Sequence, residues 1–195
     1  MKAVRLVMVA VGGQGNLLAA HVLGQAALES SVPVHMSEIH GMAQRGGVVE
    51  SAMVFGEAES PIISDGCADV LLGFEPAETL RALNRANPAT TVITSTSPLP
   101  PFTAALGKGK YPEMGTILSL LKEKTARVIP LDAAALARRA GNPLAANMVL
   151  LGALCRTELV PVTKEAVLAA METHTKKSFL PANREAFSLG FEAAA

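Results

Sequence analysis

Hydrophobic residues occur in short uninterrupted runs, which alternate with segments in which apolar residues recur every three to four positions. Uninterrupted runs rich in valine, isoleucine and leucine are typical of strands buried on both faces, whereas the second spacing indicates helices. The runs predict strands over residues 6–11, 32–38, 48–55, 68–72, 90–95 and 127–131. The helical spacing predicts helices over residues 16–28, 76–83, 116–124 and 132–139. This alternation predicts an α/β, Rossmann-like fold with a mostly parallel sheet and helices on both faces.

The last third of the chain has a different pattern. Residues 143–159, 163–173 and 181–191 show helical spacing with no strand between them, so this helical third is expected to pack against the sheet or a partner protein. Residues 97–115 contain four prolines and three glycines and keep neither spacing, which predicts a long loop. Half of all residues are apolar, which is enough for one sizeable core, so we expect a single domain over residues 1–195.

The N-terminal residues predict a buried strand rather than a targeting segment. Lys2 and Arg5 precede an apolar run, as they would in a signal peptide, but no convincing cleavage site follows. No apolar run reaches the roughly 18 residues that a membrane-spanning helix needs. We therefore expect no membrane segment.

The charge balance disfavours binding to polyanions. Lys+Arg and Asp+Glu each number 17, so no net charge attracts nucleic acid or anionic lipid. Charged residues make up only 17% of the chain, against roughly 25% in average soluble domains. This low fraction indicates either a surface partly covered by another subunit or simply an alanine-rich composition.

Two cysteines, Cys67 and Cys155, lie far apart in the chain and form no metal-binding motif. An iron–sulfur cluster held by this chain's cysteines alone is excluded, because the usual site needs four ligands. Reduced, semi-buried thiols fit a cytoplasmic protein better than a disulfide does.

A glycine cluster follows the first predicted strand and precedes a helix. It consists of Gly12, Gly13, Gln14 and Gly15. Backbone NH groups at such a turn bind anions, because a helix N-terminus carries partial positive charge. Gly13 and Gly15 match the first two glycines of the dinucleotide fingerprint and Glu38 could bind a ribose, but Leu18 occupies the third glycine position. A tight turn that binds no nucleotide is an equally good interpretation.

A second polar loop follows the strand predicted over residues 32–38. Its candidate ligand- or subunit-binding residues are Glu38, His40, Gln44, Arg45, Gly46 and Gly47. Arg45 can bind a carboxylate or phosphate with two hydrogen bonds, and His40 can titrate near neutral pH. The alternative is a loop ordered by an ion pair between Glu38 and Arg45 and buried against a neighbouring subunit.

Other polar residues have simpler explanations. His21, His35 and His174 fit surface or hydrogen-bonded histidines, and Asn142 precedes Pro143 where its side chain can cap a helix. No serine lies in a GxSxG sequence, which disfavours a serine hydrolase. We predict no catalytic residue and no metal ligand in this chain.

Several motifs recur in a fixed order along nearly the whole chain. They are Gly12-Gly13-Gln14-Gly15; His40-Gly41-Met42-Ala43-Gln44-Arg45-Gly46-Gly47; Asp69-Val70-Leu71-Leu72-Gly73-Phe74-Glu75-Pro76; Asn147-Met148 with Leu151-Gly152-Ala153-Leu154; and Asn183 with Ala186-Phe187 and Leu189-Gly190-Phe191. In these motifs the chain resembles the gamma-type subunit of 2-oxoacid:ferredoxin oxidoreductases, and in particular the small (beta) subunit of indolepyruvate:ferredoxin oxidoreductase.

The resemblance implies a subunit of an enzyme that oxidatively decarboxylates a 2-oxoacid, joins the acyl group to coenzyme A and passes electrons to ferredoxin. It implies that thiamine diphosphate and iron–sulfur clusters are held by a large partner subunit, that this chain alone binds no cofactor and is inactive alone, and that the substrate is an aryl pyruvate. The two glycine loops would then form one polar edge facing the partner. Arg45 would anchor this edge by holding a coenzyme A phosphate, a substrate carboxylate or a partner carboxylate.

Two other functions remain open from the residues themselves. The chain could be a free-standing nucleotide-binding module or NAD(P)-dependent enzyme using Gly13, Gly15 and Glu38, although Leu18 weighs against this. It could also be a structural scaffold without a ligand, in which case changes to the glycine loops would weaken assembly alone.

Overall fold

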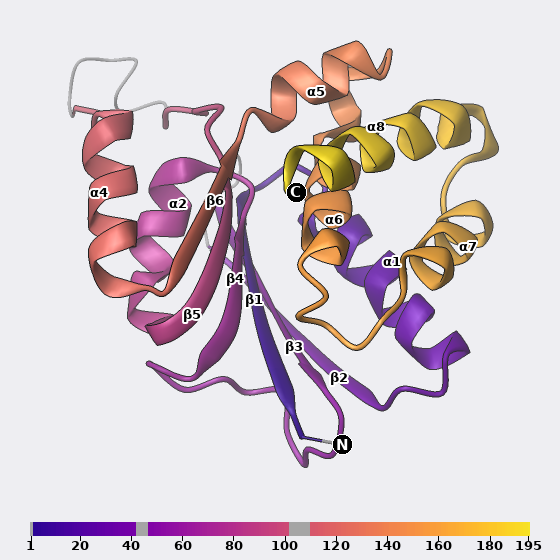
Figure 1. Ribbon diagram of the computed structural model, residues 1–195, viewed down its shortest axis with the longest axis horizontal. Helices are drawn as coiled ribbons and strands as arrows, with labels where there is room; N and C mark the ends of the chain where they lie inside the picture. Colours follow the sequence, from indigo (N-terminus) through magenta and orange to yellow (C-terminus); the bar gives the residue numbers. More distant parts are fainter. Residues whose placement is uncertain (1, 42–46, 102–109) are drawn as a thin grey trace.

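Six strands form one sheet in the computed structural model, which describes residues 2–41, 47–101 and 110–195 (Figure 1). The strands are β1 (Val4–Val11), β2 (Val34–His40), β3 (Val48–Phe55), β4 (Ala68–Gly73), β5 (Ala86–Ser95) and β6 (Arg127–Leu131). Their order across the sheet is β2-β3-β1-β4-β5-β6. β1, β4, β5 and β6 are parallel, while β3 runs antiparallel to both β1 and β2.

Helices cover both faces of this sheet, as the sequence predicted. The helices are α1 (Asn16–Glu29), α2 (Pro76–Arg81), α4 (Met114–Lys124), α5 (Ala133–Arg139), α6 (Ala146–Arg156), α7 (Lys164–His174) and α8 (Leu180–Ala193), with 3-10 turns η1 (Ala82–Arg85), η2 (Pro143–Ala145) and η3 (Lys177–Phe179). α2 and α4 lie on one face, and α1, α6, α7 and α8 lie on the other (Figure 1).

The alternation of side chains along β1 explains the two layers. Leu6 and Met8 point into the larger core, with α1, α6, α7 and α8, whereas Val7 and Val9 point into the smaller core, with α2 and α4. All four are almost completely buried. A strand covered on both faces needs apolar residues at every position, which is why β1 is one uninterrupted apolar run.

The predicted elements are confirmed with small shifts at their ends. β5 begins at Ala86 rather than at residue 90, and the helix predicted over residues 143–159 is a 3-10 turn followed by α6, which ends at Arg156. The predicted long loop precedes α4, and its residues 102–109 lie outside the described part. The interpretation of both cysteines as semi-buried is wrong, because Cys67 is exposed and Cys155 is buried; both are free thiols.

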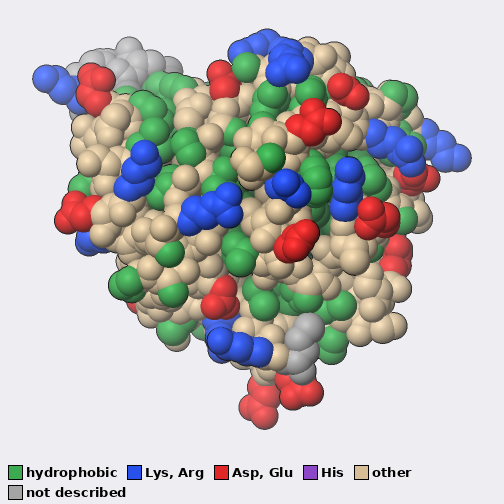
Figure 2. All heavy atoms as spheres, in the orientation of Figure 1, with side chains coloured by type: hydrophobic (Ala, Val, Ile, Leu, Met, Phe, Trp, Pro, Cys, Tyr) green, Lys and Arg blue, Asp and Glu red, His purple; other side chains and the backbone are tan. Residues whose placement is uncertain are grey.

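The surface agrees with the balanced composition. On the face shown in Figure 2, basic and acidic side chains are interspersed rather than gathered by sign.

Within the described residues, no helix is both long enough and apolar enough to cross a membrane.

Candidate functional site at the carboxyl edge of the sheet

The two glycine loops meet at one edge of the sheet. β1 and β2 lie on either side of β3 and run in the same direction, so their carboxyl ends reach the same edge. The backbone NH of Gly12 donates to the carbonyl of Gly47 at 2.8 Å, which joins the loops directly. Gly12 and Gly13 are exposed, so the edge is accessible. The predictions for Gln44, Arg45 and Gly46 concern residues outside the described part of the chain.

The turn after β1 needs glycine at two positions. Gly13 and Gly15 have φ of 97° and 77°, a left-handed region that other residues rarely adopt. A Cβ atom on Gly15 would also lie 2.6 Å from Nδ2 of Asn147. Glycine at position 15 is therefore required both by the turn and by the close approach of α6.

Gln14 holds the turn in place through its side chain. Its Oε1 accepts a hydrogen bond from the Val11 NH at 2.8 Å, and its Nε2 donates to the Phe74 carbonyl at 3.2 Å. The amide therefore links the carboxyl ends of β1 and β4. Gln14 contributes to the predicted edge by fixing the backbone of the turn.

The N-terminus of α1 faces the same edge without a capping side chain. Gly15 occupies the cap position, and within the described residues no side chain caps the helix and no acidic residue lies in its first turn. The first NH groups of a helix carry partial positive charge and attract anions when they are left uncapped. Asn147 fixes this end of α1, because its Nδ2 donates to the Gly15 carbonyl at 3.2 Å while its Oδ1 accepts from the Met148 NH at 3.0 Å.

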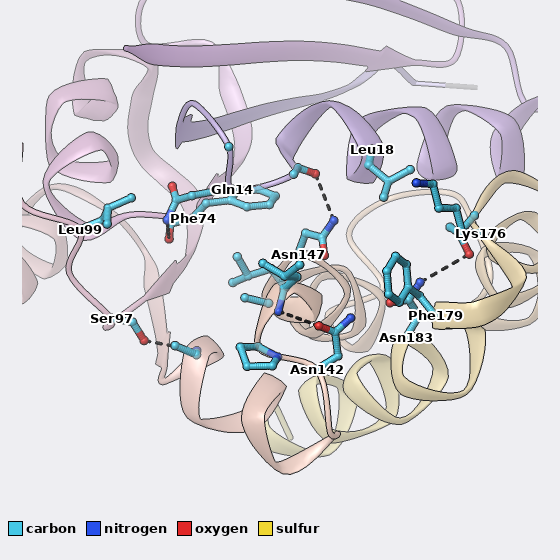
Figure 3. Close-up of a pocket in the computed structure, with 18 of the residues that line it drawn as sticks. Gln14, Leu18, Phe74, Ser97, Leu99, Asn142, Asn147, Lys176, Phe179 and Asn183 are labelled. Carbon is cyan, nitrogen blue, oxygen red and sulfur yellow. Dashed lines mark hydrogen bonds between the residues drawn. The ribbon is translucent and has the colours of Figure 1, made fainter. Parts of the chain in front are cut away.

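A cleft of about 770 Å³ opens between this turn and the C-terminal helices (Figure 3). Its apolar lining includes Leu18, Phe74, Leu99, Leu150 and Phe179. Its polar lining includes Gln14, Ser97, Asn142, Asn147, Lys176 and Asn183. A predominantly apolar cleft of this size with a few fixed polar groups is the usual form of a small-molecule site.

The C-terminal third supplies one wall of the cleft. Asn183 on α8 is only 6% exposed, and its Nδ2 donates to Oγ1 of Thr175 at 3.4 Å. Lys176 lies on the same side of the cleft as Leu18 of α1 (Figure 3). His174 also lines the cleft and is hydrogen-bonded as predicted, because its Nε2 lies 3.4 Å from Glu29 Oε1.

The opposite wall is the backbone that follows β5. The Thr96 NH donates to the Leu131 carbonyl at 2.9 Å, and the Ser97 hydroxyl donates to Asp132 Oδ1 at 2.6 Å. The hydrogen bonds from Ser97 and from the Ala135 NH lower the pKa of Asp132 below its ordinary value. The Ala135 NH donates to Asp132 Oδ1 at 2.9 Å, so Asp132 caps α5, as the sequence predicted. The same oxygen accepts the hydrogen bond from Ser97.

Glu38 and His40 lie on the exposed edge strand β2, with 3.7 Å between Glu38 Oε2 and His40 Nε2. In a dinucleotide-binding domain, the ribose-binding acid follows the strand next to the glycine turn. Here β3 lies between β1 and β2, so Glu38 belongs to a strand that does not neighbour β1. This sheet order weighs against the NAD(P)-dependent alternative.

Several cleft residues were not recognised as such from the sequence. Asn142 caps the following turn as predicted, with its Oδ1 accepting from the Leu144 NH at 3.1 Å, but it also lines the cleft. Asn147 and Asn183 belong to the family motifs, but the sequence alone indicates no role for them. A single polar residue among the buried positions of a helix is the sequence feature that could have identified them. Both residues are at least nine-tenths buried.

Among the described residues, no three histidine, cysteine, aspartate or glutamate side chains gather in a way that could hold a metal ion.

Comparison with curated proteins gives whole-length relatives. The chain is 40% identical over 185 residues to the indolepyruvate oxidoreductase subunit IorB of Methanothermobacter thermautotrophicus, covering 95% of this chain and 94% of that protein. It is 37% identical over 196 residues to the subunit of the same name from Pyrococcus horikoshii, covering 100% and 97%.

Solved structures share the fold at low identity. The gamma subunit of a keto/oxoacid ferredoxin oxidoreductase from Geobacter sulfurreducens matches with a TM-score of 0.70 and 23% identity, covering 98% of each chain. A chain of 2-oxoglutarate:ferredoxin oxidoreductase from Magnetococcus marinus, solved with 2-oxoglutarate, coenzyme A and succinyl-CoA bound, matches with a TM-score of 0.75 and 17% identity. That match covers 100% of this chain but 31% of the longer one.

The family comparison agrees with the motifs quoted from the sequence. Residues 5–193 match the family described as pyruvate ferredoxin/flavodoxin oxidoreductase. The match spans both glycine loops, the sheet and the C-terminal helices, and it includes the described residues that line the cleft. This confirms the resemblance, and the chain belongs to the pyruvate ferredoxin/flavodoxin oxidoreductase family.

Proposed function

We propose that this chain is the non-thiamine-binding subunit of a ferredoxin oxidoreductase that converts an aryl pyruvate to its acyl-CoA. The observation that carries this proposal is the match to relatives named indolepyruvate oxidoreductase subunit IorB over 94–97% of their own lengths. The chain therefore aligns with nearly the whole length of those subunits, and we expect it to be the corresponding subunit of such an enzyme.

The proposed partner is a large subunit that holds thiamine diphosphate and iron–sulfur clusters and passes electrons to ferredoxin. The proposed location of the complex is the cytoplasm. Thiamine diphosphate, when bound there, supplies the electron sink for decarboxylation. This assignment is supported by the two cysteines of the present chain, which are fewer than the four ligands that a cluster needs. It is also supported by the Magnetococcus enzyme, in which the matching fold is part of a longer chain.

Coenzyme A is the ligand that suits the cleft. Its phosphates match the uncapped N-terminus of α1 and the cation of Lys176, which lines the same cleft, since both favour anions. Its remaining parts are uncharged and match walls formed by Phe74, Leu99 and Phe179. The thiol has to reach the partner's active site, so the exposed edge formed by Gly12 and Gly13 is the side expected to face the large subunit.

Purification of the tagged chain from its native source tests the proposal. We expect a large subunit containing thiamine diphosphate and iron–sulfur clusters to co-purify, and the complex to reduce ferredoxin in a coenzyme A-dependent reaction. Its kcat/KM for indolepyruvate should exceed that for pyruvate and 2-oxoglutarate by at least about tenfold, the equivalent of 1.4 kcal/mol. A partner without thiamine and clusters contradicts the subunit assignment, and equal kcat/KM values contradict the aryl preference.

Reconstitution of the complex with Arg45→Ala tests the anchor predicted from the sequence. A raised KM for coenzyme A would indicate phosphate binding, a raised KM for the 2-oxoacid would indicate carboxylate binding, and weakened assembly would indicate a partner contact. Unchanged assembly together with unchanged kcat/KM for both substrates would eliminate Arg45 as an anchor.

A further inference from the structure

Glu75 is a buried carboxylate between β4 and α2, next to the cleft residue Phe74. It is only 1% exposed, and it accepts three hydrogen bonds. The donors are the NH of Glu78 at 2.9 Å, the NH of Leu99 at 3.1 Å and the hydroxyl of Tyr111 at 2.5 Å. The first of these caps α2, whereas the other two hold a different part of the chain.

Leu99 and Tyr111 lie near the two ends of the predicted long loop, and Glu75 Oε1 holds both. The Tyr111 hydroxyl also accepts from the Ala77 NH at 3.2 Å. Burial and the hydrogen bond to Glu75 raise the pKa of Tyr111 above its ordinary value, so the phenol keeps its proton over a wider pH range and donates to Glu75.

This hydrogen-bonding arrangement matters for the cleft because Leu99 forms part of its wall. Figure 3 shows Leu99 beside Phe74 on the side of the cleft opposite Lys176 and Phe179. Thr96 and Ser97 are fixed by Leu131 and Asp132, but these contacts end before Leu99. Among the described residues, Glu75 is the side chain that fixes the backbone at Leu99 itself.

We propose that Glu75 is a positioning residue for coenzyme A, which holds Leu99 beside Phe74 and so fixes the wall against which the ligand packs. This inference rests on the proposed function, because it takes coenzyme A as the occupant of the cleft. A wall that is already ordered spares the ligand the cost of ordering it on binding. Loss of the contact therefore weakens binding of coenzyme A and leaves the chemistry at the partner's active site unchanged.

Glu75→Gln and Tyr111→Phe in the reconstituted complex test the proposal. We expect the KM for coenzyme A to rise about tenfold in Glu75→Gln, because the neutral amide has one acceptor oxygen where the carboxylate has two, and the hydrogen bonds that it keeps are no longer charge-assisted. Tyr111→Phe should raise it about threefold, and kcat at saturating coenzyme A should stay within about twofold in both variants. The matched control is Glu78→Gln, because Glu78 is a neighbouring acidic residue in the first turn of α2 and no hydrogen bond joins its side chain to Leu99 or Tyr111 among the described residues.

Hydrogen exchange on the full chain gives a second readout that needs neither coenzyme A nor a partner. The amide of Leu99 should exchange about tenfold faster in Glu75→Gln than in the wild-type chain, because the neutral amide offers one acceptor oxygen to three donors and holds Leu99 less tightly. Wild-type exchange at Leu99, or faster exchange with an unchanged KM for coenzyme A, overturns the positioning role and leaves the proposed function standing.

The remaining outcomes are also decisive. A wild-type complex without coenzyme A dependence overturns the proposed function, and this inference with it. If Glu75→Gln does not fold, Tyr111→Phe decides, since it keeps the buried carboxylate and removes a single donor; an unchanged KM in that variant overturns the inference. A fall in kcat without a change in KM indicates a purely structural role and overturns it as well.

Discussion

Glu78 lies in the first turn of α2, where one of its carboxylate oxygens, Oε2, is buried without a hydrogen-bond partner among the described residues. Its other oxygen, Oε1, lies 3.2 Å from Arg81, whose side chain is 66% exposed. Burial raises the pKa of Glu78, Arg81 partly opposes this effect, and the nearby Glu75 adds to it. An exposed partner contributes little, so ionised Glu78 costs the folded state free energy.

The pH dependence of stability follows from this raised pKa. The folded state binds the Glu78 proton more tightly than the unfolded state, so the resulting stability is fully present below the unfolded pKa and is lost as pH rises through the folded pKa. We predict that Glu78→Gln increases the free energy of unfolding at pH 7 by about 1 kcal/mol, and that this gain shrinks towards pH 4. Urea unfolding at both pH values measures the effect. An equal loss of stability at both would show that the contact with Arg81 dominates.

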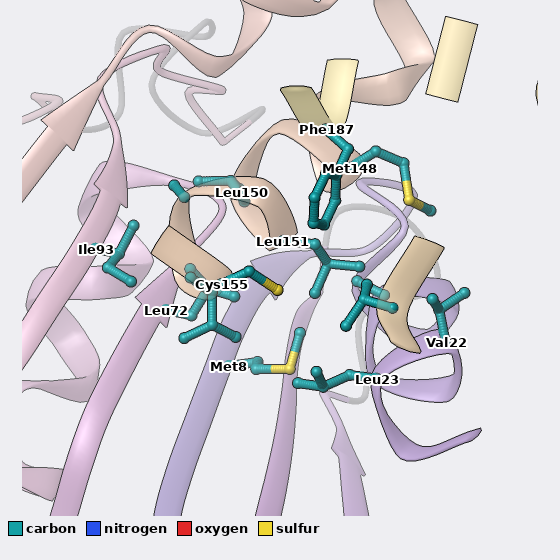
Figure 4. Packing of buried hydrophobic residues seen from close by; sticks show 14 of the residues in the cluster. Met8, Val22, Leu23, Leu72, Ile93, Met148, Leu150, Leu151, Cys155 and Phe187 are labelled. Carbon is teal, nitrogen blue, oxygen red and sulfur yellow. The ribbon is translucent and has the colours of Figure 1, made fainter. Parts of the chain in front are cut away.

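At the scale of elements, α6 and α8 pack so closely that each contributes a glycine to the contact. A Cβ atom on Gly152 would clash with the carbonyl oxygen of Phe187, and one on Gly190 would clash with the carbonyl oxygen of Val149. Around this contact, Met148, Leu151 and Phe187 fill the larger core (Figure 4). The Leu151-Gly152 and Leu189-Gly190 motifs therefore have a packing role, which places Asn147 and Asn183 against the cleft.

We predict that Gly152→Ala lowers the free energy of unfolding by about 1–3 kcal/mol, because the added methyl group forces the two helices apart. The matched control is Gly115→Ala in α4, where a Cβ atom would meet no atom within 4 Å. That substitution should be neutral or should stabilise the chain by up to about 1 kcal/mol, because glycine has greater freedom in the unfolded chain. Urea unfolding of both variants makes the comparison, and equal effects would argue against the close contact.

At the scale of the whole molecule, the order of the strands decides which functions the glycine turn can serve. β3 separates β1 from β2, so Glu38 lies on the outer strand, while the turn faces a cleft completed by α6, α7 and α8. The glycine turn is thereby separated from its expected ribose-binding acid and joined to residues from the end of the chain. The N-terminus of α1 still favours anions, but Glu38 lies on the outer strand and residues of the C-terminal helices line the cleft instead.

This arrangement predicts that the full chain binds neither NAD(H) nor NADP(H). We expect a Kd weaker than about 1 mM for each in a calorimetric titration, equivalent to less than about 4 kcal/mol of binding free energy. Micromolar binding by the chain without a partner would instead favour the free-standing nucleotide-binding module.

The sequence by itself determined the elements and the position of the glycine turn. Strand runs such as residues 6–11 and caps such as Asp132 depend on neighbours within one turn or one strand, so local patterns are enough to find them. The family motifs likewise indicate the family from the sequence alone. The sequence also predicted that the two glycine loops lie together at the carboxyl ends of the first two strands. The hydrogen bond between Gly12 and Gly47 confirms that the two loops meet.

Only the tertiary structure decided the strand order and the composition of the cleft. Strands that are apolar on both faces offer similar surfaces to many neighbours, so the pattern does not reveal that β3 pairs with both β1 and β2. The cleft depends on contacts between residues distant in sequence, such as Gly15 with Asn147 and Glu75 with Leu99 and Tyr111. Such contacts form only when the packed helices and sheet bring these segments together, because no local preference of either partner encodes the other's position.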